Sequence, residues 1–321
     1  MTSEVAALIV HFQRADLTEA IVSDLLSLAP TRLAAVVVID NGSPEPWQPP
    51  PPLLDAAHRA QVDLRCVRSD HPGGFAMAVN AARRHTDAAV LALVNNDVRL
   101  TGDPFPALLS RLATGAALVG PRITFPDGRY QLSWGRDLSL AEERRERRRF
   151  HAQHRGEQGP ADRDVPDARP VDWVSGAFLC ISARAFDMVG GLDEGFTFYY
   201  EDVDLCRRLR TAGAAVWYEP AAVVQHALNA THTDVSTAGA GSAAALRLMR
   251  ARAAGHVRYY ARHNGVGATL TVCGWETART LRTAHLRSLT QTGALLSSVW
   301  AAAGTPALTA GRGSGAGGPL R

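Results

Sequence analysis

Short apolar runs alternate along the first hundred residues with segments whose apolar residues recur every three or four positions. The runs predict strands over residues 5–10, 34–39, 63–67 and 88–94, and the periodic segments predict helices over 17–28 and 75–84. Asp16, with Glu19 three residues later, resembles a capping box at the start of the first helix. This alternation predicts an α/β fold with a mostly parallel central sheet flanked by helices.

The pattern changes in the second half of the chain. A charge-rich insertion over 136–172 predicts a solvated helix followed by a mobile loop, or else a flap that meets an anionic acceptor or a membrane. Strand and helix patterns return over 171–182, 183–189, 202–211 and 221–224. We therefore expect a catalytic domain over 1–237, a helical extension over 238–303 and a flexible tail over 304–321. The four consecutive prolines at 49–52 predict a loop without regular structure.

Composition narrows the chemistry. The 321 residues include 34 basic and 31 acidic side chains, with a formal net charge of +3, and none of the basic residues is lysine. Schiff-base chemistry and a P-loop lysine are thereby excluded. The small net charge argues against nucleic acid as a partner. Four scattered cysteines suggest reduced thiols, and the absence of a basic leader or a long apolar run predicts a cytoplasmic protein.

Polar loops follow the predicted strands. His11 ends the first strand, Asp40 begins Asp-Asn-Gly-Ser after the second, and Asn95-Asn96-Asp97 follows the fourth. The carboxyl ends of parallel strands meet at one edge, where ligands bind. There Asp97 can hold a hard divalent cation, and Asp40 either shapes a turn or accepts a hydrogen bond from a pyrimidine N–H. No G-x-G-x-x-G follows the first strand, which disfavours a nicotinamide or flavin enzyme.

Three later features have a structural and a functional interpretation. Glu201, Asp202 and Asp204 either cap a helix or supply a general base beside aromatic residues. His226 ends a strand as a structural residue or as a metal or phosphate contact. Trp173 to Ala177 forms a strand with Gly176 inside it, which indicates either a bulge in the core or a close approach of a sugar.

Taken in order, these motifs resemble the family 2 inverting glycosyltransferases of the GT-A fold, in particular the bacterial rhamnosyltransferase-like branch. The resemblance covers about residues 4–230 and rests on the following segments: Asp40 to Ser43, Gly73 to Asn80, Asn95 to Asp97, Trp173 to Ala177, Tyr200 to Leu205 and His226. It implies an enzyme, with a nucleotide-diphospho-sugar transferase fold and a helical C-terminal extension.

The resemblance also implies roles for individual residues. It implies a nucleotide-sugar site of His11, Asp40, Gly73, Gly74, Asn80, Asn95 and Asn96, an acceptor site of Trp173, Gly176 and Ala177, a Mg²⁺ or Mn²⁺ site at Asp97 and His226, and catalysis by Asp202 with Glu201 in support. In the implied reaction Asp202 deprotonates an acceptor hydroxyl, which displaces the nucleoside diphosphate with inversion. Arginines between Glu142 and Arg155 are expected to help neutralise the diphosphate.

Several alternatives stay open at this point. The donor is dTDP-rhamnose or a UDP-hexose, and the acceptor is a lipid-linked glycan or a small natural product. The extension lies on the inner face of the membrane as a peripheral contact, packs a homodimer, or covers the sheet. A non-catalytic sugar-nucleotide-binding or scaffold protein is the main alternative to an enzyme of this kind. A sugar-nucleotide pyrophosphorylase is disfavoured because Phe12-Gln13-Arg14 offers no glycine-rich phosphate loop.

Overall fold

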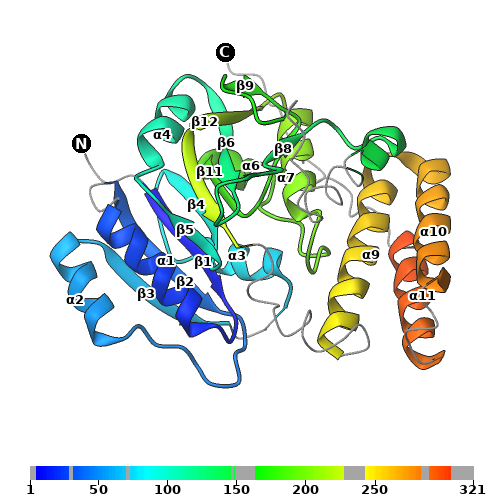
Figure 1. Ribbon diagram of the computed structural model, residues 1–321, viewed down its shortest axis with the longest axis horizontal. Coiled ribbons are helices and arrows are strands. Elements are labelled where there is room, and N and C mark those ends of the chain that lie inside the picture. The colour runs from blue at the N-terminus through cyan, green and yellow to red at the C-terminus, as the bar shows by residue number, and fades with distance from the viewer. Residues whose placement is uncertain are drawn as a thin grey trace, which may run out of the picture.

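A central mixed sheet lies between two layers of helices, with three further helices beside it (Figure 1). The computed structural model describes residues 5–28, 32–69, 73–145, 148, 163–227, 243–282 and 289–304. The expected flexible tail lies outside these residues from position 305 on. The strand order is β3-β2-β1-β4-β11-β6-β12-β5. This is the architecture that the sequence pattern predicts.

The first four long strands run parallel to one another. They are β1 (Val5–His11), β2 (Leu33–Asp40), β3 (Asp63–Arg68) and β4 (Val90–Asn95), and the connecting helices are α1 (Ala15–Leu28), α2 (Pro51–Ala60) and α3 (Phe75–Arg83). Both faces of β1, β2 and β4 are buried, which explains their continuous apolar runs. The expectation of an irregular loop at 49–52 is wrong in part: Pro51 and Pro52 open α2, where a missing N–H costs nothing.

A single long reversed strand joins the two halves of the sheet. β11 (Phe178–Ser182) is antiparallel to both β4 and β6 (Ala116–Thr124), and β12 (Ala215–His226) is parallel to β6. The short strands are β5 (Val98–Leu100), β7 (Tyr130–Gln131), β8 (Trp134–Gly135), β9 (Arg169–Pro170) and β10 (Trp173–Val174), and the helices of this half are α4 (Phe105–Ala113), α6 (Ala183–Met188) and α7 (Glu201–Thr211). The long strands other than β11 therefore share one direction, and their carboxyl ends lie along one edge.

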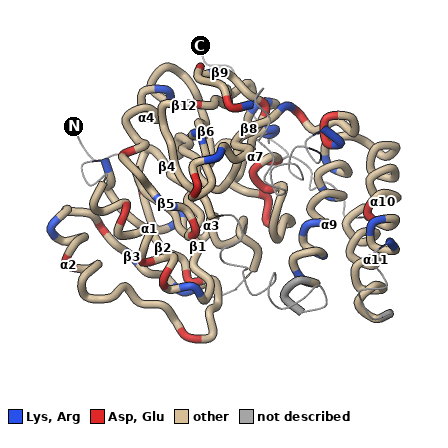
Figure 2. The backbone as a smooth tube through the Cα atoms, viewed as in Figure 1, with Lys and Arg blue, Asp and Glu red and all other residues tan. Residues whose placement is uncertain are grey.

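Three helices follow the sheet: α9 (Ala243–His263), α10 (Gly265–Arg282) and α11 (Leu289–Ala303), which pack on one another. Figure 2 shows acidic residues at the start of α7 and basic residues along α9. Among them, Asp204 is fully buried and its carboxylate bonds Arg208 of its own helix and His263 of α9 at 2.7 Å. Asp193 likewise pairs with Arg258 of α9. The extension is thus joined to the sheet domain by buried charge pairs.

The charged insertion is described at its two ends. Residues 140–145 are helical and 163–172 lead into β9 and β10, while 146–147 and 149–162, with the expected mobile loop, lie outside the described residues. Glu143 is buried against α9 and Glu142 pairs with Arg163. The described start of the insertion therefore packs its buried glutamates against the protein and leaves Arg144 and Arg145 exposed. Within the described part of the chain, no helix is both long enough and apolar enough to cross a membrane.

Candidate active site

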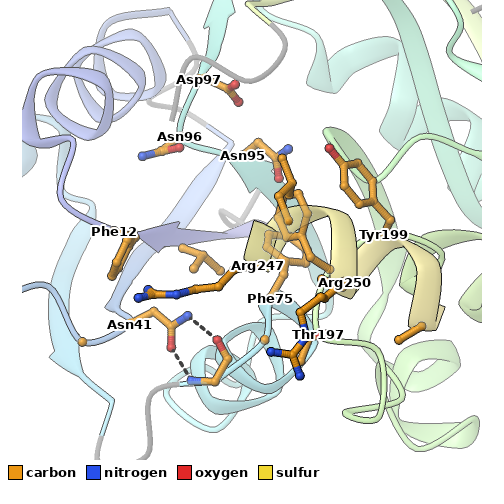
Figure 3. Close-up of a pocket in the computed structure, with 18 of the residues that line it drawn as sticks. Phe12, Asn41, Phe75, Asn95, Asn96, Asp97, Thr197, Tyr199, Arg247 and Arg250 are labelled. Atoms are coloured by element: carbon orange, nitrogen blue, oxygen red, sulfur yellow. Dashed lines mark hydrogen bonds between the residues drawn. The ribbon is translucent and has the colours of Figure 1, made fainter. Parts of the chain in front are cut away.

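A cavity of about 860 Å³ opens at the carboxyl ends of the parallel strands. One side, which we call the sheet wall, consists of Val10, Phe12, Asn41, Gly42, Gly73, Gly74, Phe75, Asn95, Asn96, Asp97 and His226. The other side, the helix wall, consists of Arg247, Leu248, Arg250, Ala251 and Ala254 of α9 with Ser298 of α11. Thr197, Phe198 and Tyr199 complete the lining (Figure 3). The position at the strand ends is where ligands bind in α/β sheets.

Two loops of the sheet wall are fastened together by one amide side chain. Asn41 donates to the Gly73 carbonyl at 2.9 Å and accepts from the Gly73 N–H at 3.0 Å, as the dashed lines of Figure 3 show. The following Gly74 lies so close to Thr197 that a Cβ there would sit 2.5 Å from its backbone. Gly73 and Gly74 therefore line the pocket, as the resemblance implies, and glycine at 74 allows the close approach.

Asp97 and His226 meet at the end of the sheet wall. The His226 Nε2 lies 3.1 Å from Asp97 Oδ1, and its Nδ1 lies 2.7 Å from Gln131 Oε1. Because Gln131 Nε2 donates to the His226 carbonyl, its Oε1 accepts and Nδ1 carries a proton. Nε2 and Asp97 Oδ1 are then the two atoms that face each other, a pair that a shared cation can bridge. These donors fit a divalent cation whose remaining ligands are phosphate and water.

That pair is small for a metal site. No group of three or more histidine, cysteine or acidic residues that could hold a metal occurs in the part of the chain that the structure describes. Asn95 and Asn96 line the pocket beside Asp97, so the triplet supplies one carboxylate. A site of two protein ligands is typical of Mg²⁺, which keeps most of its shell as water and substrate phosphate.

Asp202 sits in the first turn of α7 against the segment before β11. Its Oδ2 accepts from the Gly176 N–H and its Oδ1 from the Val203 N–H, each at 2.8 Å. A Cβ at Gly176 would lie 3.0 Å from the Asp202 Cβ, so the strand glycine that stood out in the sequence makes room for this carboxylate. Burial raises the pKa of Asp202 above its usual range, against the effect of these hydrogen bonds. A carboxylate of raised proton affinity is suited to take a proton.

Glu201 differs from its neighbour. It is buried, and its Oε2 has no hydrogen-bond partner among the described residues. Burial, helped by the adjacent Asp202 carboxylate, raises the pKa of Glu201 to about 8. Because the two acids are adjacent, they titrate as a pair. Both members of the pair therefore have a raised proton affinity, and the pair holds a proton more readily than two exposed acids would.

Neither acid lines the cavity itself, but Tyr199 connects them to it. Burial raises the pKa of Tyr199, and the carboxylates of Glu201 and Asp97 both add to the shift while Arg252 opposes it. The Tyr199 phenol therefore lies within electrostatic reach of the α7 acids and of the acid at the metal-binding end. This residue lines the pocket and stands two positions before Glu201, so the chain itself connects the pocket lining to the α7 acids.

The helix wall contributes residues that the sequence did not single out. Arg247 and Arg250 are the arginines that line the cavity in the described part of the chain. Arg250 donates to Ser298 at 2.9 Å, and Arg247 has no ion-pair partner among the described residues, unlike the arginines paired with Asp193 and Asp204. An arginine-rich amphipathic helix gives no signal for this role until the fold places it over the strand ends.

Two of the arginines expected to reach the diphosphate, Arg144 and Arg145, make other contacts in the structure. Arg144 lies over the Trp275 ring of α10 and Arg145 pairs with Glu142. The rest of the run between Glu142 and Arg155, apart from Arg148, lies outside the described residues. Arg144 therefore packs the insertion on the extension and Arg145 pairs within the insertion, and a role of either at the diphosphate stays a prediction.

Three residues expected at the nucleotide do not line the pocket. His11 is buried, with its Nδ1 2.7 Å from Thr18 Oγ1, because side chains alternate along β1 and the pocket side belongs to Val10 and Phe12. The Asn80 amide bonds Leu192 at 2.8 Å and 3.0 Å and so fastens α3 to the loop before α7.

Asp40 is the third of these. Burial raises its pKa, but hydrogen bonds from Ser43 and Trp47 and the charge of Arg68 outweigh burial and hold the pKa below its usual value. Both carboxylate oxygens are occupied by these partners, and the side chain is 1% exposed. The turn residues Asn41 and Gly42 line the pocket instead. The structural interpretation of Asp40 is the one that its contacts favour.

The residues of the predicted acceptor-side strand, Trp173, Gly176 and Ala177, have different surroundings in the structure. Trp173 is buried in the core, donates to the Arg136 carbonyl at 2.9 Å and covers Gly135, so it does not offer a face to a sugar. Ala177 is buried, and its carbonyl accepts from the Asn95 N–H at 2.9 Å. Gly176 remains next to the site through Asp202. The contacts of Trp173 and Ala177 therefore favour the structural interpretation, and their role at the acceptor stays a prediction.

Fold and site together define an α/β protein with a cavity at the strand ends, a carboxylate–histidine pair in its lining and a second pair of acids at the start of α7. A model of the glycosyltransferase-like family 2 matches residues 3–255. The chain belongs to this family and is a glycosyltransferase. The matched segment extends into α9, past the domain boundary expected at residue 237.

Curated relatives agree with this assignment. The chain is 32% identical over 227 residues to an N-acetylglucosaminyl-diphospho-decaprenol L-rhamnosyltransferase of Mycobacterium tuberculosis, which covers 63% of this chain and 69% of the relative. It is 42% identical over 64 residues to the rhamnosyltransferase WbbL of Escherichia coli, covering 20% and 23% of the two chains. These relatives support the rhamnosyltransferase-like branch of the family.

Solved structures support the fold. A crystal structure of GalNAc-T7 with UDP, GalNAc and Mn²⁺ matches with a TM-score of 0.53 at 14% identity, over 81% of this chain and 50% of that one. The mannosyltransferase PcManGT of Pyrobaculum calidifontis, in complex with GDP-Man and Mn²⁺, matches with a TM-score of 0.50 at 16% identity, over 95% and 77%. The GT-A fold that the motifs imply is confirmed.

Proposed function

We propose that this enzyme transfers a sugar from a nucleoside-diphosphate sugar to an acceptor hydroxyl with inversion, using Asp202 as the general base. The observation that carries the proposal is the Asp202 carboxylate, which is partly exposed, has a raised proton affinity and is fixed by two backbone N–H groups. The same cavity holds the Asp97 and His226 pair. A base and a site for the leaving diphosphate are the two parts that such a displacement needs.

The donor is bound between the two walls. Asn41, Gly73 and Gly74 present backbone and amide groups to the nucleoside, and Arg247 with Arg250 reaches its diphosphate from α9. Asp97 and His226 would hold Mg²⁺ or Mn²⁺, an assignment supported by the Mn²⁺ in two solved structures of this fold. When bound, the cation neutralises charge on the leaving diphosphate.

The chain's own groups then account for the proton and the displacement. The acceptor hydroxyl donates its proton to Asp202 as its oxygen forms a bond to C1 of the donor sugar. The bond from C1 to the diphosphate oxygen breaks on the opposite face, and its electron pair leaves with the nucleoside diphosphate. Glu201, neutral beside the base, keeps a second negative charge away from Asp202.

The branch of relatives guides the choice of substrates. We propose dTDP-rhamnose as the donor, with UDP-hexoses as the second choice, and a lipid-linked glycan as the acceptor in preference to a small natural product. Val266, Leu270 and Leu281 of α10 and Trp300 of α11 are exposed apolar side chains. They favour a peripheral contact of the extension with the inner face of the membrane that carries such an acceptor.

A non-catalytic binding or scaffold protein is the second candidate. The buried partners of Asp40 and Asn80 show that several family positions serve the fold, as they would in either case. The pair of acids at α7 favours turnover, because an unpartnered buried Glu201 oxygen is a cost that a scaffold has no reason to keep.

The deciding experiment compares release of nucleoside diphosphate by the wild type and by Asp202→Asn. Incubation uses dTDP-rhamnose or a UDP-hexose, with a GlcNAc-diphospho lipid of short chain as acceptor. We expect turnover to fall about a thousandfold while the affinity for the donor stays within about twofold. Asp187→Asn, an exposed aspartate paired with Arg83, is the matched control. Near-normal turnover of Asp202→Asn would exclude the proposed base.

A further inference from the structure

The turn that precedes the two α7 acids is conformationally strained. Tyr199 and Tyr200 have φ angles of 70° and 71°, in the left-handed region that residues with a side chain rarely occupy. Such a conformation is costly and persists only where its surroundings hold it. Tyr200 is the N-cap of α7, so its conformation sets the direction in which Glu201 and Asp202 leave the turn.

Helix α9 supports this turn from below with two consecutive residues. The imidazole of His256 is stacked on the Tyr200 ring, with centroids 5.3 Å apart and planes at 12°. The preceding Gly255 lies so close that a Cβ there would be 2.8 Å from the Tyr199 carbonyl oxygen. The contact therefore depends on a glycine for its distance and on a flat ring for its surface.

His256 itself is held from both sides. Its Nε2 lies 2.6 Å from Glu143 of the insertion and its Nδ1 2.8 Å from Glu276 of α10, and all three side chains are buried. Tyr260 packs edge-on against the same ring. Two carboxylates on opposite nitrogens fix both the position and the rotation of the imidazole plane. The buried cluster thus gives Tyr200 a support that cannot turn.

We propose that His256 is a positioning residue for the glycosyl transfer: held between Glu143 and Glu276, its ring keeps the Tyr199–Tyr200 turn in place and thereby aims Asp202 at the acceptor hydroxyl. The inference rests on the proposed function, because it concerns the same base. It assigns the helical extension a part in the chemistry, although His256 does not line the pocket and acts on Asp202 only through the Tyr199–Tyr200 turn.

The test compares two variants that lose the same hydrogen bonds. His256→Leu and His256→Phe both leave Glu143 and Glu276 without the imidazole, but only phenylalanine keeps a flat ring beneath Tyr200. We expect kcat of His256→Leu to fall at least tenfold below that of His256→Phe, with the affinity of both variants for dTDP or UDP within about twofold of the wild type. Equal kcat values for the two variants would overturn the proposal, as would a loss of nucleotide affinity parallel to the loss of kcat.

The partner side of the stack provides a second test where a His256 variant fails to fold. Tyr200→Phe keeps the ring and should retain kcat, whereas Tyr200→Leu should lose it about tenfold. The double variant Tyr200→Leu/His256→Leu should be no slower than Tyr200→Leu, since the two residues act through one contact. Full additivity would overturn the proposal. Failure of the proposed function is seen separately, as normal turnover of Asp202→Asn.

Discussion

The two walls of the pocket are built in different ways. The sheet wall uses residues at or after the carboxyl ends of β1, β2, β3, β4 and β12, which meet at one edge as a consequence of parallel strands. The helix wall comes from α9 and α11, more than a hundred residues later in the chain, and its place depends on buried charge pairs with the sheet domain. One wall follows from topology and the other from docking, so they should fail in different ways when altered.

The largest effect is expected where α9 is joined to α7. Asp204 is fully buried and its carboxylate contacts Arg208, Arg262 and His263. Burial raises its pKa, but these partners outweigh burial and lower it. Asp204→Asn leaves the cations without their counter-charge and should lower the free energy of unfolding by about 3 kcal/mol.

Denaturant unfolding at pH 7 measures this loss. Because the folded pKa of Asp204 lies below the unfolded value, its contribution is present at neutral pH and is lost as the solution is acidified through the folded pKa. The gap between wild type and Asp204→Asn should therefore narrow toward low pH. A loss below about 0.5 kcal/mol would show that the docking of α9 does not depend on this carboxylate.

The next effect belongs to the sheet wall. Asp97→Ala removes the one carboxylate of the Asn95-Asn96-Asp97 triplet and should abolish the metal dependence of nucleotide binding without unfolding the protein. In the wild type, chelation of Mg²⁺ or Mn²⁺ should weaken binding of dTDP or UDP about a hundredfold, as measured by calorimetry. Binding to the wild type that is unchanged by a chelator would contradict the metal site at Asp97 and His226.

Arg247 tests whether the helix wall takes part in donor binding. Arg247→Gln keeps a polar side chain but removes the charge, and we expect about tenfold weaker binding of the nucleoside diphosphate, or about 1.4 kcal/mol. Arg250→Gln should cost less, since Arg250 already donates to Ser298. Arg282→Gln, at the exposed end of α10, is the control on the extension. Equal affinities for Arg247→Gln and this control would remove α9 from the donor site.

The difference between the walls also explains what could be predicted from the sequence. Buried parallel strands leave continuous apolar runs, so the sheet, its direction and the loops at Gly73 and Asn95 could be predicted. The sequence could not predict which side of an element faces the pocket. Val10 and Phe12 line the pocket, whereas His11 between them contacts Thr18. The role of Arg247 depends on where α9 docks.

The segment from Trp173 to Ala177 is a second example of what the sequence could and could not predict. The pattern around Gly176 correctly indicates that something approaches the backbone closely, but the group that approaches is the side chain of Asp202, not a sugar. Trp173, two residues before Ser175, belongs to the core. A glycine inside a strand pattern indicates that a neighbouring group lies close, and the packed structure is needed to identify that group.

The smallest expected effect concerns Glu201 at the start of α7. Burial and the adjacent Asp202 raise its pKa to about 8, so the folded protein binds a proton that the unfolded chain releases near its ordinary value of 4.5. Stability should therefore be greatest below the unfolded pKa and decline as the pH rises through about 8. Glu201→Gln, which mimics the protonated form, should flatten this decline, so that its Tm at pH 9 exceeds that of the wild type by a few degrees.

Thermal unfolding at pH 6 and pH 9 measures the difference, with Glu194→Gln in the exposed loop before α7 as the control. Parallel Tm profiles for wild type and Glu201→Gln would mean that Glu201 is ionised in the folded protein, and its proposed role as the neutral neighbour of Asp202 would not hold.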